Sequence, residues 1–241
     1  MKKTAIVTGA RKGLGLAWCK VLVQHDYRVY LTARSIDQAE KAANSIEGEV
    51  IPMALDVTKE ESIRDAFTSF SKAESQLDLL VNNAGVNPKD YSDKEQMEGA
   101  FYLDKLLAEP MLQTIHANSI SPLLMMKHFR AMLKNAEMGK VINISSWLGS
   151  VNTIEWGYHF GYCGSKNLLN MLNKMAAIDL KEDRIVSVCV NPGWVQTDMG
   201  GSKAEFTPEQ SALNIFNHVV AKIQLSDAGK FLNDDGQDHP W

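Results

Sequence analysis

The stretch Thr8-Gly9-Ala10-Arg11-Lys12-Gly13-Leu14-Gly15 decides the fold, because it places glycines between a short apolar run and a helical pattern. The run Thr4–Thr8 is typical of a buried strand, and apolar residues at helical spacing follow the last glycine. Glycine permits a tight turn and a close approach to the backbone, while a helix N-terminus offers free N–H groups to a phosphate. The stretch therefore predicts a dinucleotide-binding turn, and the alternative is an ordinary strand-to-helix turn that happens to be glycine-rich.

Outward from this loop, short β-branched runs alternate with helical patterns along the whole chain. The runs expected as strands are Thr4–Thr8, Arg28–Thr32, Val50–Leu55, Leu77–Asn82, Val141–Ile144, Ile185–Val190 and Lys230–Leu232. After the first helix, the helical patterns cover Ile36–Ile46, Glu60–Ala73, Met111–Leu133, Tyr162–Leu180 and Pro208–Gln224. This alternation predicts the α/β class, with a single Rossmann-type doubly wound parallel sheet of about seven strands and helices on both faces. Ligands of such sheets bind beyond the carboxyl ends of the strands.

Length and charge limit the classes of protein. The chain has 241 residues, 45% hydrophobic and 22% charged, with a net charge of −4. We expect one domain over residues 1–241, with a dinucleotide-binding half at about 1–140 and a catalytic and substrate half at about 141–241. The weakly acidic charge argues against a nucleic-acid partner. The longest uncharged stretch, residues 110–126, contains polar residues and prolines, which argues against a membrane span.

The cysteines and the N-terminus indicate the compartment. Cys19, Cys163 and Cys189 are too few and too scattered for a disulfide framework or a metal cluster. The apolar run near the N-terminus is too short for a secretory signal. We therefore expect a cytoplasmic protein without a bound metal.

Further motifs follow the other predicted strands. They are Leu55-Asp56-Val57, Asn82-Asn83-Ala84-Gly85, Asn118 in the long helix, Asn143-Ile144-Ser145-Ser146, Tyr162-Cys163-Gly164-Ser165-Lys166 and Asn191-Pro192-Gly193-Trp194-Val195-Gln196-Thr197. Together with the TGxxxGxG spacing of the first loop, this ordered set resembles the short-chain dehydrogenase/reductase family over essentially the whole chain. The stretch 171–201 and the ending 229–241 are most similar to its C-factor and carbonyl-reductase-like branch.

A tyrosine and a lysine stand out among the candidate catalytic residues. Tyr162 is the only one of six tyrosines with a lysine four residues later, and positions i and i+4 share a helix face. A nearby ammonium stabilises a phenolate and so lowers the pKa of a tyrosine. The resemblance implies that Tyr162 is the general acid in reduction and that Lys166 holds the nicotinamide ribose and lowers the Tyr162 pKa. It also implies that Ser146 orients the substrate oxygen and that Asn118 holds a water that relays protons from Lys166.

The cofactor contacts implied by the resemblance surround the same edge of the sheet. They involve Gly9, Arg11, Lys12, Gly13, Leu14, Gly15, Arg34, Asp56, Val57, Asn83, Gly85, Tyr162, Lys166, Pro192, Gly193, Val195 and Thr197.

The end of the second predicted strand indicates which cofactor is bound. An acidic residue about 20 positions after the glycine loop would bind the ribose hydroxyls of NAD, but Ala33 stands there and Arg34 follows. A guanidinium can bind a 2′-phosphate, which a carboxylate would repel. Lys12 adds a second cation facing the same region. The sequence therefore predicts NADP(H), and the alternative is that both cations are solvated surface charges.

Three segments depart from the family pattern. Tyr91–Glu109 is an insertion expected as an extra helix or hairpin, and the segment after Thr197 is short. Gly149–Gly161 is rich in aromatic residues, which either line the substrate entrance or form a packed surface loop. His159 within it could bind substrate, although a lone histidine is more often structural.

We expect an NADPH-dependent oxidoreductase that reduces the carbonyl of a small-molecule aldehyde or ketone by direct hydride transfer, with Tyr162 as proton donor. One alternative is a non-catalytic dinucleotide-binding protein with a regulatory or signalling role, against which the intact catalytic residues argue. Another is an NAD-dependent alcohol dehydrogenase, which Arg34 disfavours. The resemblance also implies a homodimer or homotetramer.

Overall fold

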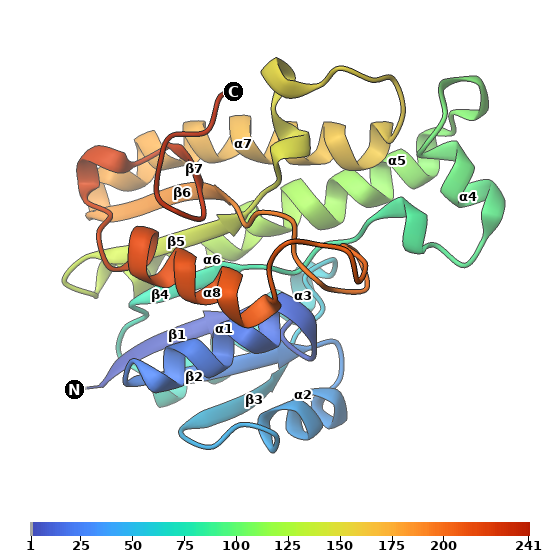
Figure 1. Cartoon of the computed structure of the whole chain (residues 1–241). Coiled ribbons are helices and arrows are strands. Elements are labelled where there is room, and N and C mark those ends of the chain that lie inside the picture. Colours follow the sequence, from blue (N-terminus) through green and yellow to red (C-terminus); the bar gives the residue numbers. More distant parts are fainter. Residues whose placement is uncertain (1) are drawn as a thin grey trace.

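The computed structural model describes residues 2–241, and its centre is a single parallel sheet (Figure 1). Its seven strands follow the order β3-β2-β1-β4-β5-β6-β7, and every pairing between neighbours is parallel. The strands are β1 (Lys3–Val7), β2 (Tyr27–Ala33), β3 (Val50–Ala54), β4 (Leu79–Asn82), β5 (Gly139–Ile144), β6 (Ile185–Asn191) and β7 (Phe231–Asn233). The order reverses between β1 and β4, which is where ligands bind in open sheets of this kind. The predicted doubly wound sheet is confirmed.

Helices cover both faces of the sheet. They are α1 (Gly13–Gln24), α2 (Ile36–Ala43), α3 (Glu60–Ala73), α4 (Lys94–Gly99), α5 (Ala108–Ile115), α6 (Ser121–Lys134), α7 (Phe160–Leu180) and α8 (Pro208–Ile215). One core cluster joins α1, α2 and α8 to the sheet, and a second joins α3 and α6 to the other face. Figure 1 shows α1 and α8 packed side by side in front of the sheet.

Alternation along the central strand explains the two layers. Ala5 and Val7 of β1 belong to the cluster with α1, whereas Ile6 between them belongs to the cluster with α3 and α6. Successive strand residues point to opposite faces, so an unbroken apolar run can bury both sides of a sheet. All three side chains are fully buried.

The long helix expected over Met111–Leu133 is divided by a π-turn. α5 ends at Ile115, the π-turn covers His116–Ile120, and α6 continues from Ser121. A second π-turn, Phe216–Val220, follows α8 within the helix expected over Pro208–Gln224. Single π-turns inside helices are frequent at functional sites, and the first one contains Asn118.

The predicted insertion forms an extra helix rather than a hairpin. α4 lies within it, between 3-10 turns at Pro88–Asp90 and Leu103–Lys105. Figure 1 shows α4 at the right-hand end of the molecule, beyond α5 and on the side toward which the strands run.

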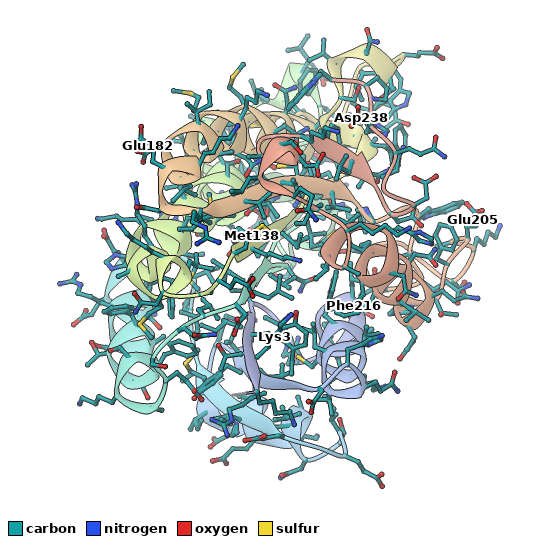
Figure 2. All side chains as sticks on the ribbon, turned by 90° about the vertical axis from the view of Figure 1, so that its left-hand side faces the viewer. Lys3, Met138, Glu182, Glu205, Phe216 and Asp238 are labelled. Carbon is teal, nitrogen blue, oxygen red and sulfur yellow. The ribbon has the colours of Figure 1, made fainter. Side chains whose placement is uncertain are left out.

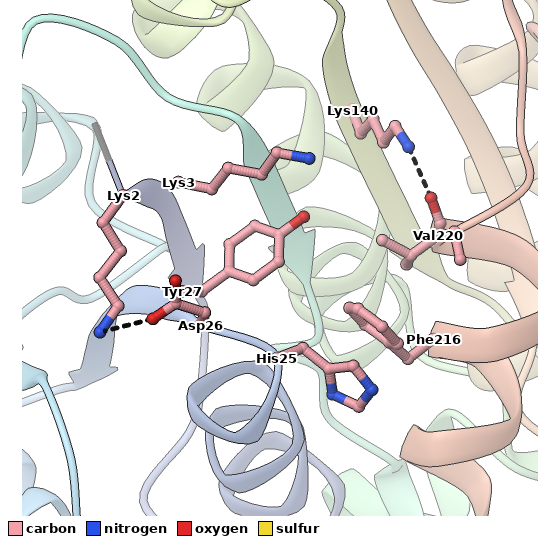
Figure 3. A pocket seen from close by; sticks show the side chains of 9 residues that line it. Lys2, Lys3, His25, Asp26, Tyr27, Lys140, Phe216 and Val220 are labelled. Carbon is pink, nitrogen blue, oxygen red and sulfur yellow. Dashed lines mark hydrogen bonds and ion pairs between the residues drawn. The ribbon is translucent and has the colours of Figure 1, made fainter.

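A cavity of about 500 Å³ lies at the opposite edge, where the strands begin (Figures 2 and 3). Lys3, Tyr27, Lys140 and Phe216 are among its lining residues. The Lys140 Nζ donates to the Val220 carbonyl at 2.6 Å, at the end of the π-turn after α8. Because a helix C-terminus carries partial negative charge, a lysine stabilises this end of the fold. Lys140 thus attaches β5 to the turn after α8, and the motif residues lie at the other edge.

Within residues 2–241, no helix combines the length and apolarity needed to cross a membrane. The same residues contain no group of three or more histidine, cysteine or acidic side chains able to hold a metal ion.

Candidate active site

The glycine loop has a backbone that only glycine fits at two positions. Gly9 has a φ of +65°, and a Cβ there would lie 2.9 Å from the Ala84 Cα. A Cβ on Gly15 would lie 2.6 Å from the Gly9 carbonyl oxygen. Behind them, the Ala10 N–H donates to the Thr32 carbonyl at 2.8 Å, which joins the loop to the end of β2. The loop is therefore held close to the strand ends, with no room for a side chain at Gly9 or Gly15.

The first turn of α1 suits a phosphate group. Lys12 stands at the N-cap position with an extended backbone, its side chain makes no capping bond, and no acidic residue lies in the first turn. The first N–H groups of a helix need partners, and the positive end of the dipole favours an anion. Gly13 opens the helix and Leu14 anchors it in the core. The free N–H groups and the glycine turn thus fit the pyrophosphate of a dinucleotide.

Thr8 is a residue of this loop that the sequence analysis passed over. Its hydroxyl accepts from the N–H groups of Asn83 and Ala84, each at 2.9 Å. The Asn83 amide returns a bond to the Thr8 carbonyl at 2.9 Å. Thr8 therefore locks the loop after β4 to the loop after β1. Its position just before the first glycine could have indicated this role, but a threonine at that position is equally typical of the last residue of a strand.

The candidate residues for the adenosine end lie after β2 and β3. Arg34 is exposed at the end of β2, next to the buried Ala33. Burial raises the pKa of Asp56, but the Thr58 hydroxyl and N–H, with smaller contributions from Lys59 and Arg34, lower it overall. Arg34 is thus close enough to Asp56 to lower the pKa of its carboxyl group. Val57, which follows Asp56, packs against the core.

The two basic residues of the glycine loop face the segment after β6. The Lys12 ammonium forms an ion pair with the Asp198 carboxylate. Arg11 also lowers the pKa of Asp198, although the larger effect comes from Lys12. The expectation that Lys12 faces the same region as Arg34 left out this acidic partner, which lies 186 residues away in the sequence.

Tyr162 and Lys166 lie on one face of α7, near its start. Tyr162 is 8% exposed and Lys166 is 5% exposed. The Lys166 Nζ lies 5.7 Å from the centre of the Tyr162 ring and donates to the Ile144 carbonyl at 2.7 Å. The end of β5 therefore fixes the lysine beside the tyrosine, as the spacing of four residues predicted.

Burial decides the protonation of this pair. It raises the pKa of Tyr162 to about 12, against a lowering by the Ser146 hydroxyl, and it lowers the pKa of Lys166 to about 8. The lowering of the Tyr162 pKa by Lys166, expected from the sequence, is not found in this structure. Desolvation of the phenol is the largest effect, and the nearby Cys163 and Asp90 raise its pKa further. Tyr162 is held here as a protonated donor.

The two serines after β5 have different surroundings. Ser146 is 8% exposed, and its hydroxyl accepts from the Leu148 N–H at 3.2 Å. The same hydroxyl lowers the pKa of the Tyr162 phenol. The Ser145 hydroxyl donates to the Asn170 side chain at 2.7 Å. The geometry thus brings Ser146 together with Tyr162 and uses Ser145 to attach β5 to α7.

Asn118 lies in the π-turn, and its side-chain amide is hydrogen-bonded to other residues of the protein. Its Nδ2 donates to the Val86 carbonyl at 2.9 Å and to the Ser165 hydroxyl at 3.0 Å, while its Oδ1 accepts from the Val86 N–H at 2.8 Å. A Cβ on Gly85 would lie 3.1 Å from the Asn118 Oδ1 and 3.8 Å from the Lys166 Nζ. Asn118 therefore holds the β4 loop against α7, close to Lys166. The water relay stays a prediction.

The segment after β6 folds back on itself. Val195 forms a bridge with Phe206, and Pro192 accepts a bond from the Ser211 hydroxyl of α8 at 2.7 Å. Gly193 has a φ of +75°, and a Cβ there would lie 2.7 Å from the Phe206 ring. The Thr197 hydroxyl accepts from the Gly200 N–H at 3.1 Å. The short segment expected here is thus an ordered turn beside the glycine loop.

A ladder of buried amides supports the site from below. The Asn82 Nδ2 donates to the Asn143 Oδ1 at 2.8 Å, and the Asn143 Nδ2 donates to the Asn173 Oδ1 at 2.9 Å. The Ser187 hydroxyl also donates to the Asn173 Oδ1. These bonds join β4, β5, β6 and α7. We call Asn82, Asn143, Asn173 and Ser187 the amide ladder.

The aromatic residues near the site stack on one another. Trp156 stacks on Tyr158 with ring centres 4.6 Å apart, and Tyr158 stacks on Phe101 of the insertion at 5.6 Å. Trp147 contacts Trp156 edge to face, directly after Ser146 in the chain. Tyr158 and Trp147 are 47% and 38% exposed. The stack is both packed and open to solvent, so its role at the substrate entrance stays a prediction.

The family model of the short chain dehydrogenases matches residues 3–208, so the chain belongs to this family of oxidoreductases. Carbonyl reductase family member 4 from Danio rerio is 30% identical over 207 residues, which cover 85% of this chain and 81% of that protein. C-signal from Myxococcus xanthus is 28% identical over 172 residues, which cover 68% of this chain and 93% of that protein. The crystal structure of NADPH-bound carbonyl reductase from chicken fatty liver is similar with a TM-score of 0.87 and 29% identity, covering 100% of this chain and 99% of that one. The resemblance to the family and to its C-factor and carbonyl-reductase-like branch is confirmed.

Proposed function

We propose that the protein is an NADPH-dependent reductase of a small-molecule aldehyde or ketone. The observation that carries the proposal is the joint burial of Tyr162 and Lys166 beside Ser146, at the edge where the glycine loop lies. A protonated phenol in a site of low exposure can donate a proton to a forming alkoxide, and the reaction needs such a donor.

Each catalytic side chain has a task in this reaction. The Ser146 hydroxyl positions the substrate carbonyl oxygen, and the Tyr162 phenol gives that oxygen its proton. Lys166, held by the Ile144 carbonyl, balances the charge left on the phenolate and binds the nicotinamide ribose. NADPH, when bound, supplies the hydride. Val195 and Thr197 would hold the nicotinamide carboxamide, and Pro192 and Gly193 fix the turn that carries them.

The proposed preference for NADP(H) rests on charge at the end of β2. Ala33 leaves no carboxylate to repel a 2′-phosphate, and the exposed Arg34 can bind it. The fatty-liver carbonyl reductase was crystallised with NADPH, which supports the same choice.

The decisive experiment measures NADPH oxidation against a panel of aldehydes and ketones, with Tyr162→Phe as the matched control. We expect turnover on part of the panel, a loss of most of kcat in Tyr162→Phe, and unchanged NADPH binding by that variant. Near-normal turnover by Tyr162→Phe would refute the assignment.

A regulatory role is the second candidate, and the similarity to C-signal favours it. NADPH binding without turnover on any compound of the panel would support this role over catalysis.

We also propose that the protein is a homodimer or homotetramer. Met171, Met175 and Ile178 recur at helical spacing on α7 and are 59%, 61% and 68% exposed, as is Leu112 of α5 at 63%. Exposed apolar stripes of this kind mark protein interfaces. Sedimentation of the wild type and of Met175→Glu tests this, with a smaller species expected for the variant. A wild type that sediments as a monomer would contradict the proposal.

A further inference from the structure

His159 has an unusual backbone at the start of the catalytic helix. Its φ of +70° and ψ of +33° place it in the left-handed region, which residues other than glycine rarely adopt. Its N–H donates to the Phe101 carbonyl at 2.7 Å, and the Gly161 N–H donates to the Ala100 carbonyl at 2.8 Å. The insertion thus holds the chain in this conformation just ahead of Tyr162.

The His159 side chain is buried and anchored. It is 8% exposed, and its Nε2 lies 2.7 Å from the Oδ1 of Asn87, which is itself 5% exposed. That Oδ1 also accepts from the Lys89 N–H at 3.2 Å, so the Nε2 of His159 carries the proton. Burial lowers the pKa of His159 to about 4, which keeps the ring neutral near neutral pH. Asn87 therefore fixes both the tautomer and the ring direction.

The fixed imidazole lies against the proton donor. The rings of His159 and Tyr162 stack with centres 5.4 Å apart and 21° between their planes. Phe101 of the insertion also packs on the His159 ring, with centres 4.5 Å apart. The imidazole thus joins Ser146 and Lys166 as a neighbour of the Tyr162 phenol, and the Lys166 ammonium lies 5.7 Å from the ring centre.

We propose that His159, anchored by Asn87 and by the insertion Tyr91–Glu109, is a positioning residue that sets the direction of the Tyr162 phenol. The inference rests on the proposed function, in which Tyr162 donates the proton. It assigns a task to the insertion, which supplies the Phe101 and Ala100 carbonyls and the Phe101 ring. His159 itself exchanges no proton in the reaction.

His159→Asn is the variant of choice, because asparagine tolerates the left-handed backbone but removes the ring next to Tyr162. We expect kcat to fall on the order of 10- to 100-fold, the loss that misplacement of a reacting group produces. NADPH affinity and substrate KM stay close to wild type. Asn87→Ala lowers kcat in the same direction, and the double variant is no worse than His159→Asn. His218→Asn is the matched control, since it makes the same replacement at an exposed histidine in the π-turn after α8, away from Tyr162, and its kcat stays near wild type.

A spectroscopic signature makes the test independent of turnover. In protein with ¹³C-labelled tyrosine, the Tyr162 ring signal is assigned through Tyr162→Phe. We expect one sharp signal in the wild type and in His218→Asn, and a broadened or doubled signal in His159→Asn. An unchanged kcat or a single sharp signal in His159→Asn would overturn the inference. So would a loss of kcat that merely follows a loss of NADPH binding. Turnover by Tyr162→Phe would defeat the proposed function, whereas the Tyr162 signal would still test its placement by His159.

Discussion

Gly9 shows at the scale of one residue how the glycine loop depends on its backbone. Its φ of +65° strains any other residue, and a Cβ at this position would lie only 2.9 Å from the Ala84 Cα, which leaves no room for alanine. We expect Gly9→Ala to destabilise the protein by roughly 1–3 kcal/mol and to weaken dinucleotide binding. Thermal unfolding and a cofactor titration measure both effects. Gly157→Ala is the control, because nothing lies within 4 Å of a Cβ there. Equal stability of the two variants would contradict the prediction.

Cofactor preference is also decided by single residues. We expect Ala33→Asp combined with Arg34→Leu to move preference from NADPH toward NADH by about tenfold or more, because the variant loses a charge-assisted bond to the 2′-phosphate and gains a carboxylate for the ribose hydroxyls. Separate Kd values for the two cofactors test this. Unchanged affinities for both would show that Arg34 does not recognise the phosphate.

The roles of residues whose partners lie nearby in the sequence could be predicted, whereas roles that depend on distant partners could not. The spacing of Tyr162 and Lys166 indicates one helix face, and the structure has both there. The roles of Thr8, Asp198 and His159 depend on partners 72 or more residues away, at Asn83, Lys12 and Asn87. Periodicity and turn chemistry carry no signal for such pairs. The direction of the Tyr162 pKa shift could not be predicted for the same reason, since it depends on burial by distant segments.

At the scale of elements, the glycine loop and the turn after β6 are joined by one ion pair. Because Asp198 competes for Lys12, we expect Asp198→Asn to leave Lys12 free for an anionic cofactor and to tighten NADPH binding several-fold more than NADH binding. The melting temperature changes little, since exposed ion pairs contribute little to stability. Asp65→Asn on the exposed face of α3 is the control. Weaker NADPH binding by Asp198→Asn would contradict the prediction.

Helix and strand types were predictable, whereas interruptions within helices were not. Strands rich in apolar β-branched residues and amphipathic helices follow from residue period. The turn at His116–Ile120 has helical residues on both sides, and Pro122 follows it at the start of α6. Pro122 has no N–H to give to the Asn118 carbonyl four residues earlier, and the Asn118 side chain bonds to the Val86 backbone across the site. The second of these causes depends on a distant partner.

At the scale of the whole molecule, one sheet joins the two halves proposed for the chain. β4 pairs with β1 on one side and with β5 on the other, so the halves at about 1–140 and 141–241 meet inside the sheet. We therefore propose a single domain and expect one cooperative calorimetric transition. Two separated transitions would contradict it.

Acid stability tests the packing of α3 on α6. Glu60 accepts from the Lys127 Nζ at 2.8 Å and from the His128 Nε2 at 2.9 Å, and the bond from Lys127 contributes most to holding its pKa at about 2. A folded pKa below the ordinary value of 4.5 gives stability above that value, which is lost as the pH falls toward 2. We expect the difference in unfolding free energy between wild type and Glu60→Gln, measured with urea, to be small and to shrink over this range. Glu61→Gln is the control, and a Glu60 difference that grows in acid would contradict the assignment.

The amide ladder has a consequence for how such a protein can change over generations. An apolar contact can lose or gain a methyl group in small steps, but a buried amide that loses its partner is left unsatisfied. Asn82, Asn143 and Asn173 therefore constrain one another, whereas the stacked aromatic loop above them has exposed members. In a library of random variants, tolerated substitutions would gather in the aromatic loop and avoid the amide ladder. New substrate preferences could then arise while the catalytic floor stays intact.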